Sequence, residues 1–151
     1  AKQIEAAIAS AGQRLGREAT TEEIAAELHL ELAEYHEWLL EVRGLALNSL
    51  DYASEREEGR NLLDAIPDNE ENWPSRLVEQ SELERLLAEA IERMPPVERT
   101  VLSLYYHEEL TLREIAGVMK LHLSRISQLK SQAILRLRAY LGKRWPGGRG
   151  R

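Results

Sequence analysis

Residues 110–141 read LTLREIAGVMKLHLSRISQLKSQAILRLRAYL, and this stretch decides the fold. It opens on Thr111 with Glu114 three residues later, which is the spacing of a capping box that begins a helix. Apolar residues at helical spacing then predict a short helix, a turn over residues 120–123 and a longer helix from Ser124. A short and a longer helix joined by a tight turn are typical of a helix-turn-helix unit that reads duplex DNA.

The longer helix has an apolar face and a polar face. Its apolar residues recur every three or four positions and are expected to face inward: Ile126, Leu129, Ala133, Leu137 and Leu141. The polar residues are expected to face outward, where arginine and glutamine can bond base edges, and serine, threonine and lysine can hold phosphates. The candidate DNA-binding residues are Thr111, Ser124, Arg125, Gln128, Lys130, Ser131, Gln132 and Arg136. An ordinary solvated helix face would have the same pattern, so both interpretations stay open.

Charge is distributed unevenly along the chain. The net charge of −6 would not suggest a nucleic-acid binder. However, residues 125–151 contain eight Lys or Arg and no Asp or Glu, whereas residues 51–72 contain eight acidic residues and two arginines. A basic carboxyl-terminal part would attract DNA phosphates in a salt-dependent way, and the acidic segment would be repelled by them.

Two stretches carry a family resemblance. Residues 102–141, through the phrases LYYHEELTLREI and SRISQLKSQAILRLR, resemble region 4 of bacterial RNA polymerase sigma factors, especially the flagellar or motility class. Residues 3–39, with the pattern LGREAT-TEEIA, are similar to sigma region 3. The resemblance implies a promoter-recognition fragment that directs RNA polymerase by reading the minus-35 element. No stretch resembles sigma region 2, so we expect the chain to be a fragment.

The helical periods and the resemblance together predict an all-α fold with two small helical domains. We expect a three-helix region 3 domain at 1–43, an acidic linker at 44–74, a region 4 helix-turn-helix domain at 75–145 and a flexible basic tail at 146–151. Gly16 is placed to end the first helix, Thr20 or Thr21 to cap the second, and Pro96 to begin a later one. The resemblance also suggests that the acidic linker mimics RNA. An ordinary solvated linker would have the same composition, so this alternative stays open.

The resemblance implies protein partners as well as promoter DNA. Sigma region 4 offers an apolar surface to the β-flap of core RNA polymerase, and anti-sigma factors compete for nearby surface. The candidate contact residues here are Leu104, Tyr105 and Tyr106, although helical spacing places much of this group in the core.

Three positions in the predicted turn depart from the expected pattern. Lys120 and His122 stand in a turn that often holds glycine, because glycine adopts a left-handed backbone without strain. Leu123 stands where sigma factors commonly carry a charged residue that contacts DNA. Its apolar side chain either touches a thymine methyl group or signals a changed promoter preference.

The sequence gives little evidence for an enzyme, a metal-binding protein or a membrane protein. The four histidines belong to no metal or catalytic-triad pattern, and no glycine-rich phosphate loop is present, so we expect no enzyme activity and no cofactor. The chain has no cysteine and no apolar run long enough to cross a membrane, which is compatible with the cytoplasm. A free-standing helix-turn-helix regulator and an anti-sigma-binding interaction module remain as alternatives.

Overall fold

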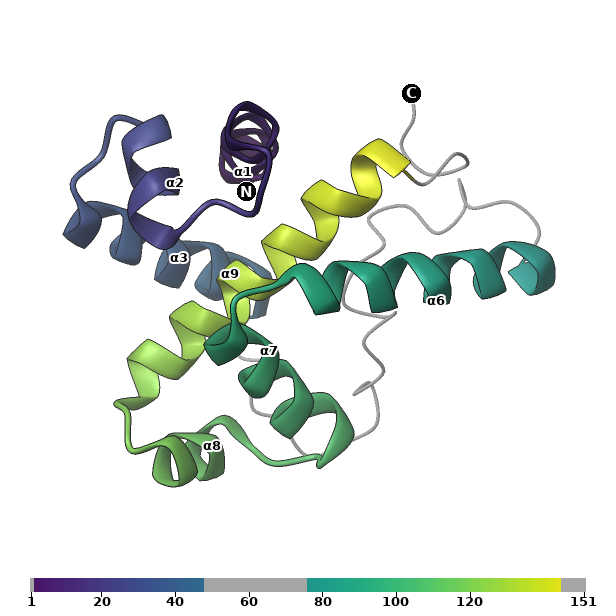
Figure 1. Ribbon diagram of the computed structural model, residues 1–151. Coiled ribbons are helices and arrows are strands. Elements are labelled where there is room, and N and C mark those ends of the chain that lie inside the picture. The colour runs from purple at the N-terminus through teal and green to yellow at the C-terminus, as the bar shows by residue number, and fades with distance from the viewer. Residues whose placement is uncertain (1, 48–75, 145–151) are drawn as a thin grey trace.

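A computed structural model describes residues 2–47 and 76–144 of the chain, and within them every regular element is a helix (Figure 1). The predicted all-α fold is therefore confirmed. The first three helices are α1 (Lys2–Leu15), α2 (Thr21–Glu27) and α3 (Leu32–Leu47). After the linker come α6 (Arg76–Arg93), α7 (Pro96–Leu102), a π-helical turn η2 (Ser103–His107), α8 (Leu112–Met119) and α9 (Leu123–Arg144).

The helix boundaries follow from local chemistry. Thr20 is the cap of α2, with its hydroxyl accepting from the Glu23 N–H while the Glu23 carboxylate accepts from the Thr20 N–H. Gly16 follows α1 with φ of 75°, a left-handed conformation that glycine adopts without strain. Pro96 is the first residue of α7, where its missing N–H leaves no bond unmade. The predicted turn is one residue shorter than expected, because α9 begins at Leu123.

The long helix α9 forms the axis of the molecule (Figure 1). Its residues belong to three separate apolar clusters. Leu135 and Ala139 pack with α1, α2 and α3, and Ala133 and Leu137 pack with α6. A third cluster joins α9 through Ile126 to η2 and α8. The two predicted domains thus pack on one shared helix.

The predicted connector lies mostly outside the described residues. Helix α3 continues to Leu47, beyond the expected domain end at residue 43. Residues 48–74 and the tail 146–151 are not among those described, so the domain division and the RNA-mimic hypothesis stay predictions. In the parts of the chain that the structure does describe, no helix is both long enough and apolar enough to cross a membrane.

Candidate nucleic-acid interface

The helix-turn-helix unit is formed by α8, residues 120–122 and the first turns of α9. Thr111 caps α8, because its hydroxyl accepts from the Glu114 N–H at 3.1 Å while its own N–H donates to the Glu114 carboxylate at 2.8 Å. Lys120 then adopts a left-handed conformation with φ of 60°. The two helices meet through Ile115 and Ile126, both fully buried. The sequence prediction of a capped helix, a tight turn and a second helix is confirmed.

The polar face of α9 is covered by protein, which corrects the expectation that it faces outward. Gln132 is 1% exposed, Arg136 3% and Gln128 9%. Arg125 and Ser131 are half-buried, whereas Ser124 is exposed. The physical reason is that α2 and α3 pack against this side of α9 and supply hydrogen-bond acceptors in place of water.

Three polar side chains of α9 form hydrogen bonds directly with α2 and α3. Arg125 Nη1 donates to His36 Nε2 at 3.3 Å, and Gln128 Nε2 donates to the backbone carbonyl of His36 at 3.3 Å. One turn further along, Gln132 Nε2 donates to Thr21 Oγ1 at 3.0 Å. The α2–α3 surface therefore presents a row of acceptors to the same donors that were predicted to bond base edges and phosphates.

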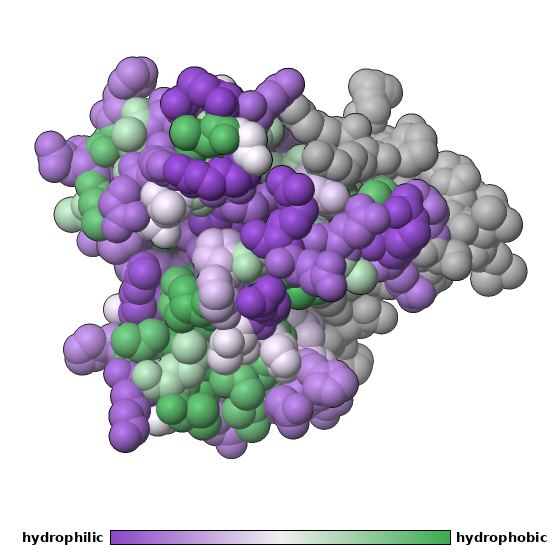
Figure 2. Space-filling view, in the orientation of Figure 1, coloured by the Kyte–Doolittle hydropathy of each residue, from purple (hydrophilic) through white to green (hydrophobic). Residues whose placement is uncertain are grey.

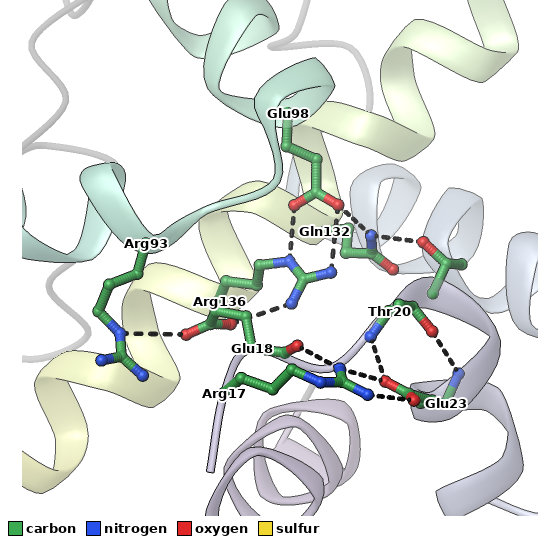
Figure 3. A network of polar contacts seen from close by, with 9 residues as sticks. Arg17, Glu18, Thr20, Glu23, Arg93, Glu98, Gln132 and Arg136 are labelled. Atoms are coloured by element: carbon green, nitrogen blue, oxygen red, sulfur yellow. Dashed lines mark hydrogen bonds and ion pairs between the residues drawn. The ribbon is translucent and has the colours of Figure 1, made fainter. Parts of the chain in front are cut away.

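A buried ion network continues this row (Figure 3). The Arg136 guanidinium donates from Nε to Glu98 Oε1 at 2.7 Å and from Nη1 to Glu18 Oε1 at 3.0 Å. Gln132 Nε2 also donates to the Glu98 carboxylate. Burial by itself lowers the pKa of Arg136, but the nearby carboxylates outweigh this and raise the pKa above its ordinary value. Arg136 on α9 is thus bonded both to α7, through Glu98, and to the segment before α2, through Glu18.

Sequence reasoning did not identify the acceptors Glu98, Glu18, Thr21 and His36. One signal was available for Glu98, because it precedes Val101 by three residues and Leu102 by four, which places a carboxylate within an apolar helical stripe. Such a buried carboxylate requires a partner of opposite charge. No comparable pattern marks the other three residues.

The covering contact is not fully satisfied. Within the described residues, the buried Tyr35 hydroxyl and Gln132 Oε1 have no hydrogen-bond partner. Burial is the main reason that the pKa of Tyr35 is raised. Each buried polar atom that loses water without gaining a partner costs about 1–3 kcal/mol. The contact between α3 and α9 is therefore less stable than its apolar area alone would make it.

His36 is the titratable group at the outer end of the same contact. Its pKa lies below the ordinary value, first because burial disfavours the charged ring and second because the Arg125 guanidinium is nearby. Glu22 acts in the opposite direction to a smaller extent. The neutral form of His36 is the one that accepts from Arg125.

Lys130 and the Leu104–Tyr106 group lie away from the covered face. The Lys130 ammonium lies 4.5 Å from the centroid of the Tyr105 ring, a cation–π contact, and Lys130 is only 7% exposed. This corrects the expectation of a solvated or phosphate-binding lysine. Tyr105 is buried and packs edge-on against Tyr106, while Leu104 and Tyr106 are half-buried. Whether Leu104, Tyr105 and Tyr106 contact a partner stays a prediction.

Comparisons with known proteins agree on one family. The model described as Sigma-70 region 3 matches residues 1–78, and that described as Sigma-70, region 4 matches residues 90–139. RNA polymerase sigma factor FliA of Escherichia coli (strain K12) is 41% identical over 143 residues, which are 95% of this chain and 59% of that protein. RNA polymerase sigma-D factor of Bacillus subtilis (strain 168) is 36% identical over 143 residues, which are 94% of this chain and 56% of that protein.

A solved structure is also similar. It is described as a cocrystal of the flagellar sigma/anti-sigma complex, Sigma-28/FlgM, and is 28% identical with a TM-score of 0.49. The match covers 95% of this chain and 57% of that chain. The chain thus spans less than two thirds of the relatives that it matches.

Proposed function

The chain belongs to the sigma-70 family, and from this premise we propose that it is the promoter-recognition part of a flagellar-type sigma factor. In this proposal α8 and α9 read the minus-35 element as a helix-turn-helix, with the amino-terminal turns of α9 in the major groove. The observation that carries the proposal is that the capped α8, the tight turn and residues 123–139 of α9 lie within the region 4 match.

The proposed DNA contacts are those predicted from the sequence. Arginine and glutamine at positions 125, 128, 132 and 136 supply donors along one side of α9, where they suit base edges and phosphates. Ser124, Ser131 and the Thr111 hydroxyl are proposed phosphate contacts. Lys130 is the weakest candidate, because its ammonium lies on the Tyr105 ring.

The proposal requires α9 to separate from α2 and α3 before DNA binds. In the structure Gln128, Gln132 and Arg136 already have protein acceptors, so a base edge must replace them. If the covered arrangement predominates, the apparent affinity for DNA is reduced by the fraction of molecules in the open arrangement. The unpartnered Tyr35 hydroxyl and Gln132 Oε1 lower the cost of that separation.

The proposed partners are promoter DNA and core RNA polymerase. The β-flap of the polymerase is proposed to contact the surface around Leu104 and Tyr106, with Tyr105 supporting it from the core. An anti-sigma factor is the further partner that the family implies. Such a role places the chain in the cytoplasm and assigns it no catalytic step of its own.

The test is a duplex-binding titration by fluorescence anisotropy. One duplex carries a motility-type minus-35 element and the other has the same bases in scrambled order. We expect preference for the first, and we expect Gln128→Ala to reduce that preference by about 1–3 kcal/mol, the value of one good bidentate base contact. Gln3→Ala is the matched control, because Gln3 is exposed on α1 at the far end of the chain. Equal affinity of the wild-type chain for both duplexes would refute the proposal.

The alternatives are distinguished by binding to paired half-sites and to core RNA polymerase, measured beside the duplex titration. A chain that binds paired half-sites as a dimer and does not bind core RNA polymerase would be a free-standing regulator. A folded chain that binds the polymerase flap or an anti-sigma factor and no duplex would be an interaction module.

A further inference from the structure

The amino-terminal tip of α9 combines exposure with apolar character. Among the described residues the exposed large hydrophobic side chains are Leu32, Val97, Val118, Leu121 and Leu123, so three of the five lie within residues 118–123. Figure 2 shows hydrophobic surface gathered at the lower end of the view, where α7 and α8 lie. Leu123 is the first residue of α9 and is 38% exposed. The polar residues farther along this helix are largely covered, so the tip is the accessible part of its first turns.

The backbone around Leu123 is well defined. Lys120 turns the chain through a left-handed conformation, and the Leu121 N–H donates to the Ala116 carbonyl at 3.1 Å. The His122 carbonyl then accepts from the Ile126 N–H at 3.1 Å. These bonds fix residue 123 at the point where α9 begins, and Ile126, three residues further along, is buried.

We propose that Leu123 is a specificity-determining residue that packs against the 5-methyl group of a thymine in the minus-35 element. Residues at the amino-terminal end of a recognition helix are the ones that meet base edges in the major groove. A leucine there has no donor for phosphate or guanine, and the one apolar group that a base pair presents in that groove is the thymine methyl. The inference rests on the proposed function and names one element of its sequence preference.

Deoxyuridine provides the direct test, because it differs from thymine only by that methyl group. Each thymine of the minus-35 duplex is replaced in turn by deoxyuridine, and the affinity of the full 151-residue chain is measured by anisotropy. We expect one or two replacements to weaken wild-type binding about three- to tenfold, the scale of one methyl group removed from an apolar contact. For Leu123→Ala the same replacements should change affinity less than twofold. Because covering of α9 reduces all affinities by the same factor, it cancels from these ratios.

Val118→Ala is the matched control. Val118 is 60% exposed on α8, so its truncation also removes apolar surface near the turn without touching the first residue of α9. It should keep the wild-type response to deoxyuridine. Circular dichroism of both variants checks that the helices are retained.

Two results would overturn the inference while leaving the proposed function intact. One is a wild-type chain that prefers the promoter duplex yet is indifferent to every deoxyuridine replacement. The other is a Leu123→Ala variant whose response equals that of wild type, in which case weaker binding of this variant to core RNA polymerase would assign the tip to a protein contact. A chain that does not distinguish promoter from scrambled duplex would refute the inference and the proposed function together.

Discussion

Replacing Glu18 by glutamine should increase DNA binding although Glu18 lies outside the helix-turn-helix. Its carboxylate accepts from Arg136 at 3.0 Å and thereby holds the segment before α2 against α9. The side chain of Arg136 is 2% exposed and that of Glu18 21%, so the pair is largely protected from water. Glutamine keeps the shape of the side chain and removes its charge, which weakens the contact without creating a cavity.

The size of the effect follows from the geometry. A hydrogen bond between charged groups contributes about 1.5–3 kcal/mol. Arg136 keeps its two bonds to Glu98, and glutamine can still accept one weaker bond, so a loss near the lower limit of about 1.5 kcal/mol is expected. That corresponds to about a tenfold rise in the ratio of open to covered molecules. If the covered form predominates, the apparent affinity for DNA rises by the same factor.

The assay compares Glu18→Gln with Glu37→Gln in the duplex titration described above. Glu37 is exposed on α3, so its replacement changes the net charge equally without loosening the Arg136 contact. Any general gain from reduced repulsion by phosphate is therefore common to both variants. Equal affinities for the two variants would refute the argument that contact with α2 and α3 limits DNA binding.

Three further predictions concern stability and pH. Arg136→Met should lower the free energy of unfolding by about 3–5 kcal/mol, because it leaves the buried Glu98 carboxylate without its charged partner, and urea denaturation showing a loss below about 1 kcal/mol would contradict this. The covered arrangement favours neutral His36, whose pKa there lies below its ordinary value of about 6.5. This preference stabilises the covered arrangement fully above about pH 6.5 and is lost as the pH falls through the lowered pKa. As the pH falls from 7.5 to 5.5, the DNA affinity of the wild-type chain should therefore rise more than that of the His36→Gln variant. Parallel pH profiles of the two affinities would exclude the effect. Lys120→Gly should raise the free energy of unfolding by up to about 1 kcal/mol, because glycine adopts φ of 60° without the strain of a side chain. The melting temperature should rise accordingly, and an unchanged or lower melting temperature in a thermal scan would contradict this prediction.

Local signals in the sequence predicted the helices well because their causes are local. The capping threonine at 111 and the proline at 96 act within one helical turn, so they can be recognised without the rest of the molecule. The inward set of α9 was also predicted correctly, since Ile126, Leu129 and Leu137 all lie in apolar clusters. Boundaries were less certain, and α9 begins one residue earlier than expected.

The sequence by itself determined an all-helical chain, a helix-turn-helix and the membership of its two regions in one family. Only the tertiary structure decided what the polar face of α9 contacts. Gln132 and Thr21 are 111 residues apart, and Arg136 and Glu18 are 118 apart. Helical periodicity separates apolar from polar positions. However, the polar positions recur with the same spacing whether their side chains bond water, DNA or an acceptor from a distant part of the chain. The partner of that face depends on how α2 and α3 pack on α9, and the sequence pattern of α9 does not predict that packing.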